Sequence, residues 1–332
     1  MQVCRRRKND PGTVNKHPVK VSVALITYNH APYIRQALDS VLMQKTDFPF
    51  EIVIGEDCSM DGTREIINKY RNKYPELIRI VTAENNVGAT KNVIRTLESC
   101  QEKYIALLEG DDFWVDQHKL QRQVDFMEKH QDFNLCIDDC SVINERGNLV
   151  KKSRVPTEIK KKGPILNYSD LLYYTPPTVT VLFRNKREII QRAGEVNNAS
   201  DHFLFYVAAQ KMKVYYNQVI SAAHRQNSKS TYNPLSPSDK IQKHSLPNLN
   251  ELSKMVDKSN RKEKKALAYG YAIAYANLFL FAYDAHSSNQ MKSAFNNLIR
   301  YDLQSHKPLL PITLFRLFKR GVKRLYNREK AG

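Results

Sequence analysis

The feature that most constrains the fold of this chain is a short apolar run that ends directly in polar residues. It occurs three times, at Val21–Ile26, Ile52–Ile54 and Tyr104–Leu108, with helix-like patterns and one further strand-like run, Ile78–Val81, between them. Continuous apolar runs of this length are typical of parallel strands buried on both faces. Strands that alternate with helices at this spacing predict a doubly wound α/β sheet.

Polar clusters follow the three runs at the point where each predicted strand ends. They are Thr27-Tyr28-Asn29, Glu56-Asp57 and Glu109-Gly110-Asp111-Asp112. Ligands of open α/β sheets bind beyond the carboxyl ends of the strands, so we expect the clusters to meet at one edge. The three crowded carboxylates of the last cluster repel one another unless a cation joins them. Hard oxygen ligands suit Mg²⁺ or Mn²⁺, and phosphates can complete the coordination shell.

Each cluster taken alone also has an ordinary structural interpretation. The pair Asp61-Gly62 is typical of a turn, and Thr63 is a suitable cap for the helix that follows. The acids after Leu108 are equally compatible with a turn that caps a helix. The order and spacing of the clusters favour a functional role.

Four segments occur in a fixed order after the expected elements. They are TYNHAPYIRQALDSVLMQ, IVIGEDCSMDGT, NNVGATKN and YIALLEGDDFW. Together they closely resemble the inverting family-2 glycosyltransferases of the GT-A fold, over about residues 20–225 and most strongly over 20–130. The resemblance implies a GT-A-type doubly wound mixed sheet with a C-terminal helical extension.

The same resemblance implies the reaction. The expected enzyme is a hexosyl- or N-acetylhexosaminyltransferase that moves one sugar from a nucleotide-diphosphate donor, by default a UDP-sugar. The expected acceptor is a glycan or a lipid-linked hydroxyl in cell-surface polysaccharide synthesis. The QxxRW signature of processive synthases is absent, which favours one transfer per binding event.

The resemblance also assigns the donor residues. Thr27 and Tyr28 would line the nucleoside pocket, Asp57 would bind the nucleobase, and Lys91 would lie near the nucleotide. Asp111 is expected on the ribose or metal side and, with Asp112 as the direct ligand, would hold Mn²⁺ or Mg²⁺.

Glu109 stands where an aspartate is commoner, and its longer side chain leaves its contacts unassigned. The expected catalytic base is Asp201, which would take the proton of the acceptor hydroxyl in a single in-line displacement. An aspartate at a helix start is also an ordinary cap, and Glu195 is the reserve candidate for the catalytic base.

The family often carries the motif YRxH later in the sequence. In this chain Asn227 takes the place of that histidine, and Arg225 is a candidate phosphate contact.

The charge of the chain narrows the choice of partner. Lys and Arg number 52 against 34 Asp and Glu, a formal net charge of +18, which attracts polyanions. No nucleic-acid-binding module accompanies the basic clusters, so we expect no nucleic-acid partner. The five unpatterned cysteines argue against a disulfide framework, and Cys136 and Cys140 lack the partners of a zinc site. The N-terminus lacks the apolar run of a signal peptide, so we expect a cytoplasmic protein.

The pattern divides the chain into three parts. They are a flexible basic leader (1–18), a catalytic domain (19–230, with 19–130 binding the nucleotide-sugar and 131–230 the acceptor) and a helical C-terminal region (231–332). Within the catalytic domain we expect a strand over Thr178–Phe183, a helix over Asp201–Gln210 and a strand over Val214–Ile220.

Two C-terminal segments bear on membranes. Residues 266–283 carry no charge, but their length barely reaches that of a membrane span, and a buried helix is the preferred interpretation. Residues 312–327 predict a basic amphipathic helix at an anionic membrane surface, on the inner face of the plasma membrane. Packing of that helix on protein is the alternative.

Two other functions fit parts of the sequence. A metal-dependent nucleotidyltransferase also uses an α/β sheet and metal-bound phosphates. It typically has a glycine-rich phosphate loop after the first strand, and TYNHAPY contains no glycine. A basic membrane-surface binding protein without catalysis gives no reason for acids to gather behind three strands.

Overall fold

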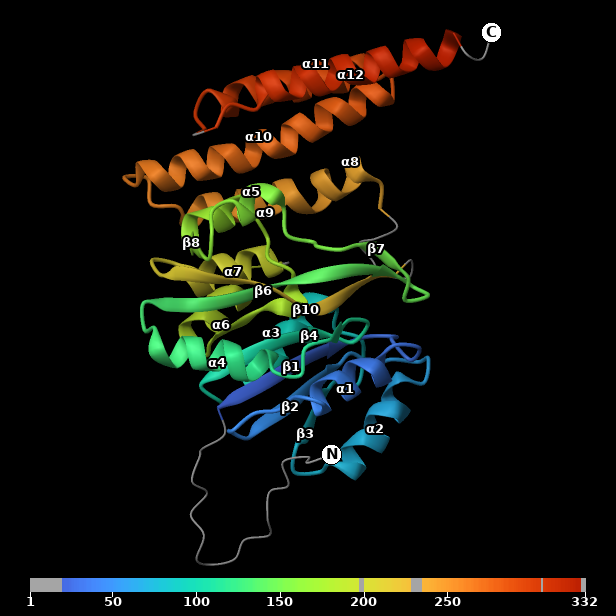
Figure 1. The fold of residues 1–332 in the computed structure, drawn as a ribbon, viewed down its shortest axis with the longest axis vertical. Helices are drawn as coiled ribbons and strands as arrows, with labels where there is room; N and C mark the ends of the chain where they lie inside the picture. The colour runs from blue at the N-terminus through green and yellow to red at the C-terminus, as the bar shows by residue number, and fades with distance from the viewer. Residues whose placement is uncertain (1–19, 197–199, 228–234, 306, 330–332) are drawn as a thin grey trace, which may run out of the picture. The chain divides into compact units, whose positions relative to one another are not determined.

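The computed structural model describes residues 20–329, except 197–199, 228–234 and 306 (Figure 1). The expected basic leader, 1–18, lies outside the described residues. The chain divides into two compact units. The first comprises Met1–Tyr168 and Pro176–Ser228, and the second comprises Ser169–Thr175 and Lys229–Gly332.

The first unit begins with the predicted alternation of strands and helices (Figure 1). The elements are β1 (Val21–Thr27), α1 (Ile34–Leu42), β2 (Phe50–Glu56), α2 (Thr63–Lys73), β3 (Ile78–Thr82), α3 (Ala89–Ser99), β4 (Tyr104–Glu109), β5 (Phe113–Trp114) and α4 (Lys119–Lys129). β1 pairs in parallel with β2 and with β4, and β2 pairs in parallel with β3. Because these strands share one direction, their carboxyl ends meet at one edge of the sheet.

The rest of the first unit widens this sheet. Its elements are β6 (Phe133–Asn144), β7 (Leu149–Lys151), α5 (Thr157–Lys160), β8 (Ile165–Asn167), the 3₁₀ turns η1 (Tyr168–Leu172, which enters the second unit) and η2 (Thr178–Thr180), β9 (Leu182–Arg184), α6 (Arg187–Gly194), α7 (Asp201–Ala209) and β10 (Lys213–Gln226). The strand order is β3-β2-β1-β4-β9-β6-β10-β5, with β7 beside β6 and β8 beside β10. β9 runs antiparallel to both neighbours, so the predicted mixed sheet is confirmed.

The composition of the core explains why the first strands could be predicted from the sequence. Val23, Leu25 and Ile54 are fully buried in one hydrophobic cluster, together with Ile34 and Leu38 of α1. Burial on both faces of a strand requires an unbroken apolar run, and burial on one face of a helix requires the observed spacing.

Two elements differ from the sequence-based prediction. The strand predicted over Thr178–Phe183 is a 3₁₀ turn followed by the short strand β9. Thr180 donates hydrogen bonds from its backbone N–H (2.9 Å) and its hydroxyl (2.8 Å) to the carbonyl of Pro177, which favours the turn. The long strand β6 was not predicted, because the buried acids Asp138 and Asp139 interrupt its apolar pattern.

The second unit is helical, as predicted. Beyond the short helix α8 (Pro237–Lys240) and the π-turn η3 (Ile241–Ser245), it consists of α9 (Leu246–Met255), α10 (Arg261–Asp284), α11 (Ser288–Asp302) and α12 (Leu310–Glu329). By length and composition α10 could cross a membrane, with a mean hydropathy of 1.3 in an 18-residue window, but 61% of that window is buried within the protein. At Gly270 an added Cβ would lie 2.7 Å from the carbonyl oxygen of Leu172, which shows how closely the chain packs there.

Candidate active site

Backbone hydrogen bonds hold the polar clusters together at the sheet edge. The N–H of Asp57 donates to the carbonyl of Thr27 (3.1 Å), and the N–H of Gly110 donates to the carbonyl of Ile26 (2.8 Å). A Cβ at Gly110 would lie 2.5 Å from Oγ1 of Thr27 and 2.8 Å from Nδ1 of His30. The glycine therefore allows the acidic cluster to approach β1 more closely than any side chain would permit.

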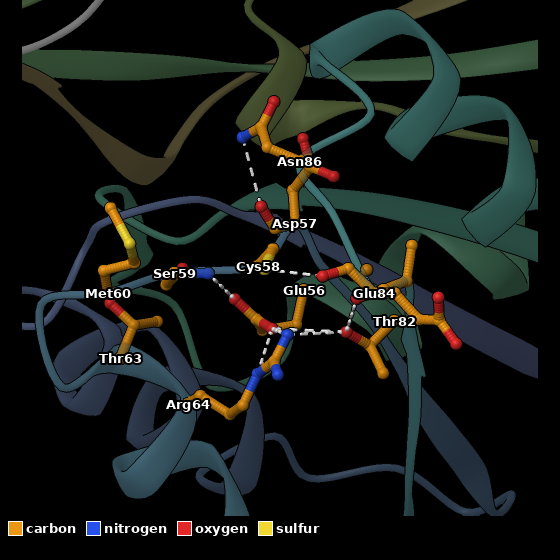
Figure 2. Close-up of polar contacts among 12 residues, drawn as sticks. Glu56, Asp57, Cys58, Ser59, Met60, Thr63, Arg64, Thr82, Glu84 and Asn86 are labelled. Atoms are coloured by element: carbon orange, nitrogen blue, oxygen red, sulfur yellow. Dashed lines mark hydrogen bonds and ion pairs between the residues drawn. The ribbon is translucent and has the colours of Figure 1, made fainter.

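Asp57 fastens a loop to the end of β2 (Figure 2). Its carboxylate accepts hydrogen bonds from the backbone N–H groups of Val87 and Gly88, each at 2.9 Å, and from Arg95 at 3.2 Å. The amide of Asn86 donates to the Asp57 carbonyl at 3.1 Å. Each carboxylate oxygen can accept about two hydrogen bonds, so Oδ2 keeps an accepting position for a ligand.

The turn after Asp57 is built on a buried acid, Glu56 (Figure 2). The Glu56 carboxylate accepts from the N–H of Ser59 and from Nε of Arg64, both at 2.6 Å. Burial favours the neutral form, but the hydrogen bonds from Ser59 and the charge of Arg64 outweigh it and hold the pKa of Glu56 below its usual value. Cys58 adopts a φ of 63°, and its thiol donates to the carbonyl of Glu84 at 3.4 Å.

The other predicted donor residues surround this turn. Thr27 is buried beside His30, with 3.2 Å between Oγ1 and Nδ1. The side chain of Tyr28 is 41% exposed, and Lys91 is exposed in the first turn of α3. Asn29 links the loops, since its N–H donates to Ser59 Oγ at 2.9 Å. Hydrogen bonds therefore join the loops that follow β1 and β2.

Asp112 is the buried centre of the acidic cluster. Its Oδ1 accepts from the N–H of Arg225 at 2.7 Å, and its Oδ2 lies 3.0 Å from Nδ1 of His224. Single ligand atoms of Glu109, Asp112 and His224 all lie within 4.8 Å of one another. Two carboxylates and an imidazole at this separation suit a divalent cation such as Mn²⁺.

The electrostatics of Glu109 support the same interpretation. Burial raises the pKa of its carboxyl well above the usual value, and the nearby charges of Asp112, Asp201 and Asp111 raise it further. Such crowding costs free energy unless a cation compensates it. Glu109, which was left without a role in the sequence analysis, belongs to the cluster.

Asp111, the other ligand predicted from the sequence, faces a different neighbour. Its carboxylate lies 3.9 Å from Nε2 of His30. Burial and the charge of Asp112 raise the pKa of Asp111, and His30 opposes them. The three-residue group therefore differs from the predicted pair, because it contains Glu109 and His224 in addition to Asp112 and omits Asp111.

His224 was not predicted, because the family motif places its histidine at the position of Asn227. The structure brings an imidazole to the cluster from three residues earlier. In the antiparallel pairing of β5 with β10, Trp114 lies opposite Ala222 and Phe113 opposite Ala223. The next step of the same register brings His224 beside Asp112.

Arg225 secures the acidic turn. The guanidinium is buried and donates to the carbonyl of Asp111 (3.0 Å) and to Oε1 of Gln36 (2.8 Å), and it lies 4.6 Å from the ring centre of Tyr33. It also donates to the carbonyl of Glu145 (3.1 Å). The N–H groups of Arg225 donate to acceptors of the protein itself. This corrects the interpretation of Arg225 as a phosphate contact.

Asp201 is the first residue of α7, but it is not the helix cap. Ser200 takes that role, since its Oγ accepts from the N–H of Phe203 at 3.4 Å. Asp201 Oδ2 instead accepts from the hydroxyl of Thr178 at 2.5 Å. Burial raises the pKa of Asp201, while Thr178 and Arg154 lower it. The charge of Asp201 in turn raises the pKa of Glu109.

The reserve base, Glu195, directly follows the last residue of α6. Within the part of the chain that the structure describes, no hydrogen bond or ion pair joins it to the acidic cluster. The sheet edge therefore combines a loop that can hold a nucleobase, a group that can hold a cation, and the half-buried carboxylate of Asp201.

Comparisons with known proteins agree with this geometry. The model of glycosyl transferase family 2 matches residues 22–187, half of the 332-residue chain. Two curated relatives match shorter segments. The Mycobacterium bovis protein Mb1547, which is described as uncharacterized, is 39% identical over 136 residues, covering 41% of this chain and 39% of that protein. The putative teichuronic acid biosynthesis glycosyltransferase TuaG of Bacillus subtilis is 41% identical over 107 residues, covering 32% of this chain and 41% of TuaG. The matches thus span about two fifths of each relative's length.

Solved structures share the fold over nearly the whole chain. Residues 1–349 of Staphylococcus aureus TarS, solved in complex with UDP-GlcNAc, align with a TM-score of 0.64 and 21% identity, covering 94% of this chain and 92% of the other. The mannosyltransferase PcManGT of Pyrobaculum calidifontis, solved with GDP-Man and Mn²⁺, aligns with a TM-score of 0.59 and 16% identity, covering 95% and 83%. At these identities the likeness establishes the GT-A-type fold and nothing finer.

Proposed function

Since this chain belongs to glycosyltransferase family 2, we propose that it moves one sugar from a nucleotide-diphosphate donor to an acceptor hydroxyl, with inversion, in the synthesis of a cell-surface polysaccharide. The observation that carries the proposal is the group formed by Glu109, Asp112 and His224 beside the loop held by Asp57. The group can hold a divalent cation that neutralises a diphosphate, and Asp57 of the loop can accept a hydrogen bond from a nucleobase N–H.

The nucleoside would bind between the first two strand ends. Tyr28 is exposed enough to cover a base, Oδ2 of Asp57 retains an accepting position, and Lys91 offers a cation at the start of α3. A UDP-sugar is our first choice of donor, and the UDP-GlcNAc bound by TarS supports it by analogy.

The residues present fit a divalent cation. Glu109, Asp112 and His224 would hold it, and Asp111 would face the ribose or complete the shell. A bound Mn²⁺ or Mg²⁺ supplies charge neutralisation for the departing nucleoside diphosphate. The imidazole favours Mn²⁺ over Mg²⁺, which prefers oxygen ligands. PcManGT, solved with Mn²⁺, is consistent with this choice.

Asp201 would act as the general base. Its hydrogen bond to Thr178 fixes one carboxylate oxygen and leaves the other free to take the proton of the acceptor hydroxyl. Burial raises its pKa, which makes it a stronger base than an exposed aspartate. In this scheme residues 19–130 supply the donor groups and 131–230 supply Asp201 and His224.

A donor screen tests the proposal. Thermal stabilisation is measured with UDP-, GDP-, CDP- and dTDP-sugars, each with and without Mn²⁺. We expect one nucleotide class to stabilise the protein in a metal-dependent way. Asp201→Asn should keep this stabilisation and lose transfer at least ~100-fold, the range of general-base contributions. Absence of metal-dependent stabilisation by every donor would overturn the proposal, and substantial turnover by Asp201→Asn would place the base elsewhere.

We further propose that α12 contacts an anionic membrane surface, where a lipid-linked acceptor would be found. The helix packs through one side, since Thr313 is buried and Arg320 donates to the carbonyl of Leu280 in α10. The other side exposes Ile312 (48%) and Phe315 (56%), with Nζ of Lys319 lying 4.6 Å from the Phe315 ring. Exposed apolar side chains among cations are typical of interfacial helices.

The charge of α12 favours lipid over a second copy of the chain. Basic residues recur through the helix, whereas its sequence contains a single acid, Glu329. Two such helices would repel each other, while an anionic surface attracts both. The protein would then be cytoplasmic and peripheral on the inner face of the plasma membrane.

Vesicle flotation tests this contact. We expect binding to vesicles rich in phosphatidylglycerol and not to pure phosphatidylcholine. Changing Ile312 and Phe315 together to serine should abolish binding. Leu303→Ser, which alters an 84% exposed leucine just beyond α11, is the matched control and should bind normally. Binding that survives deletion of 308–332, or a stable dimer that the double change dissolves, would contradict the proposal.

A further inference from the structure

We propose that Arg154 binds a phosphate of the substrate, and that the buried Asp139 is the positioning residue that holds Arg154 in place. The inference rests on the proposed glycosyl transfer and adds a residue that the sequence did not suggest. It follows from three observations: how the segment around Arg154 is anchored, where that anchor puts it, and the charge and exposure of its guanidinium.

Asp139 of β6 anchors this segment. Its Oδ1 accepts from the backbone N–H groups of Arg154 and Val155, both at 3.2 Å. Its Oδ2 accepts from Ser153 Oγ at 2.6 Å and pairs with Nζ of Lys160 at 2.8 Å. The side chain is almost completely buried, so one carboxylate organises residues 153–160 from inside the sheet. A buried acid with this many donors fixes a loop firmly.

The anchor places Arg154 beside β6, the strand that pairs with the one carrying His224. The N–H of Arg154 donates to the carbonyl of Cys140 at 2.8 Å. Cys140 lies opposite Ala222 of β10, two residues before His224. The segment therefore runs one strand away from the cation-binding group.

The charge of Arg154 acts inside the site. It lowers the pKa of both Glu109 and Asp201 against the larger effect of burial. Both directions agree with the backbone position of Arg154 beside Cys140, one strand from the cation-binding group.

The guanidinium of Arg154 is also available for a ligand. The side chain is exposed, and within the described residues the guanidinium has no hydrogen-bond or ion-pair partner. Other arginines near the site differ. Arg64 is paired with Glu56, Arg95 with Asp57, and Arg225 with backbone carbonyls.

Charge balance indicates what the guanidinium would bind. Glu109, Asp111, Asp112 and Asp201 place four carboxyls at one sheet edge, and a nucleotide-sugar adds an anionic diphosphate. A divalent cation at Glu109, Asp112 and His224 offsets only part of this charge. A guanidinium pairs with phosphate oxygens in a planar, two-point geometry, so Arg154 matches a phosphate better than a neutral sugar hydroxyl.

The phosphate has two sources, the donor diphosphate and a phosphate of the acceptor, and binding measurements distinguish them. Arg154→Met is compared with Lys152→Met, which removes an equal charge from an exposed position in the same segment. Calorimetry with Mn²⁺ gives the affinities for pyrophosphate, for UDP and for uridine. Transfer assays give KM for the acceptor.

If Arg154 binds the donor, Arg154→Met should weaken UDP and pyrophosphate about tenfold and leave uridine unchanged, as expected for the loss of a charged hydrogen bond. If it binds the acceptor, UDP affinity should be unchanged and the acceptor KM should rise about tenfold with kcat retained. Equal behaviour of Arg154→Met and Lys152→Met in all assays would overturn the inference. Equal loss of UDP and uridine binding would also overturn it, because that indicates a structural defect.

Asp139 is tested through Arg154. Asp139→Asn should weaken the same ligand, and the double variant should be no weaker than Arg154→Met alone, since the anchor acts only through the guanidinium. Additive losses would refute the positioning role. If wild-type protein binds UDP, and Arg154→Met and Lys152→Met bind every ligand equally well, this inference fails and the proposed function is unaffected. Wild-type protein that binds neither UDP nor another nucleoside diphosphate defeats the proposed function, and pyrophosphate then tests Arg154 by itself.

Discussion

Gly110→Ala should damage the acidic cluster by pure overpacking. The φ of Gly110 lies outside the range that disfavours side chains, so only space is at issue. The added Cβ would lie 2.5 Å from Oγ1 and 2.8 Å from Cβ of Thr27, and 2.8 Å from Nδ1 of His30. Contacts under 3.0 Å do not persist, and Thr27 is buried in β1 with little freedom to move.

The magnitude follows from this geometry. Overpacking of a well-packed site costs about 1–3 kcal/mol. Two short contacts with Thr27 of the buried strand β1 and a third with His30 place this variant near the upper value. Because Gly110 precedes Asp111 and Asp112 directly, relief of the clash must displace the cation-binding turn. We therefore expect a loss of about 2–3 kcal/mol in the free energy of unfolding, measured by urea denaturation, together with weaker Mn²⁺ binding.

Gly194→Ala is the matched control. At this position, at the end of α6, the nearest atom to an added Cβ is Cγ2 of Ile94 at 3.5 Å, an ordinary contact. We expect its stability to be unchanged or slightly raised, and Mn²⁺ binding to be normal. A Gly110→Ala protein as stable as Gly194→Ala, with wild-type Mn²⁺ affinity, would refute the close approach of the acidic turn to β1.

Three further perturbations test the electrostatics. Because the pKa of Glu109 is raised in the folded protein, its contribution to stability is present at low pH and is lost as the pH rises through that pKa. Metal-free wild-type protein should therefore lose stability relative to Glu109→Gln as the pH rises above about 4.3, and saturating Mn²⁺ should cancel the difference. Lys119 is fully buried, and burial lowers its pKa to about 8. Its contribution to the free energy of unfolding is therefore present above the ordinary pKa of 10.5 and is lost as the pH falls through 8. The unfolding free energy of wild type minus that of Lys119→Met should rise between these pH values, and a flat difference would contradict the burial of Lys119. Asp57→Ala should free the loop held by Val87 and Gly88, cost about 3 kcal/mol in urea and abolish donor binding; unchanged stability would contradict the role of that anchor.

The parts of the fold that were predictable depend on local patterns. β1, β2 and β4 are buried on both faces over most of their length, so their sequences had to be largely apolar, with Ser22 a buried exception in β1. Their polar ends then had to share an edge, because parallel strands of an open sheet point the same way. β6 escaped prediction because Asp138 and Asp139 occupy buried positions in it, where an acid is tolerated only with partners from distant segments.

The candidate site shows the same division. Asp57 and Asp112 were identified from motifs that follow strands directly. His224 was not, because its partner Asp112 is 112 residues away and the contact depends on the pairing of β5 with β10. Arg225 was misread for a related reason. A charged side chain suggests a ligand until the protein acceptors around it are known, and those come from three separate segments.

The most direct test of the account is the coordination of Mn²⁺ itself. Pulsed electron paramagnetic resonance of the protein with Mn²⁺ and the nucleoside diphosphate that stabilises it most reports nitrogen atoms bonded to the metal. We predict one bound ion per chain with coupling to a single imidazole nitrogen, absent in His224→Gln, and loss of the ion in Asp112→Asn. Bound Mn²⁺ without nitrogen coupling in the wild type, or coupling that persists in His224→Gln, would contradict the metal group of Glu109, Asp112 and His224.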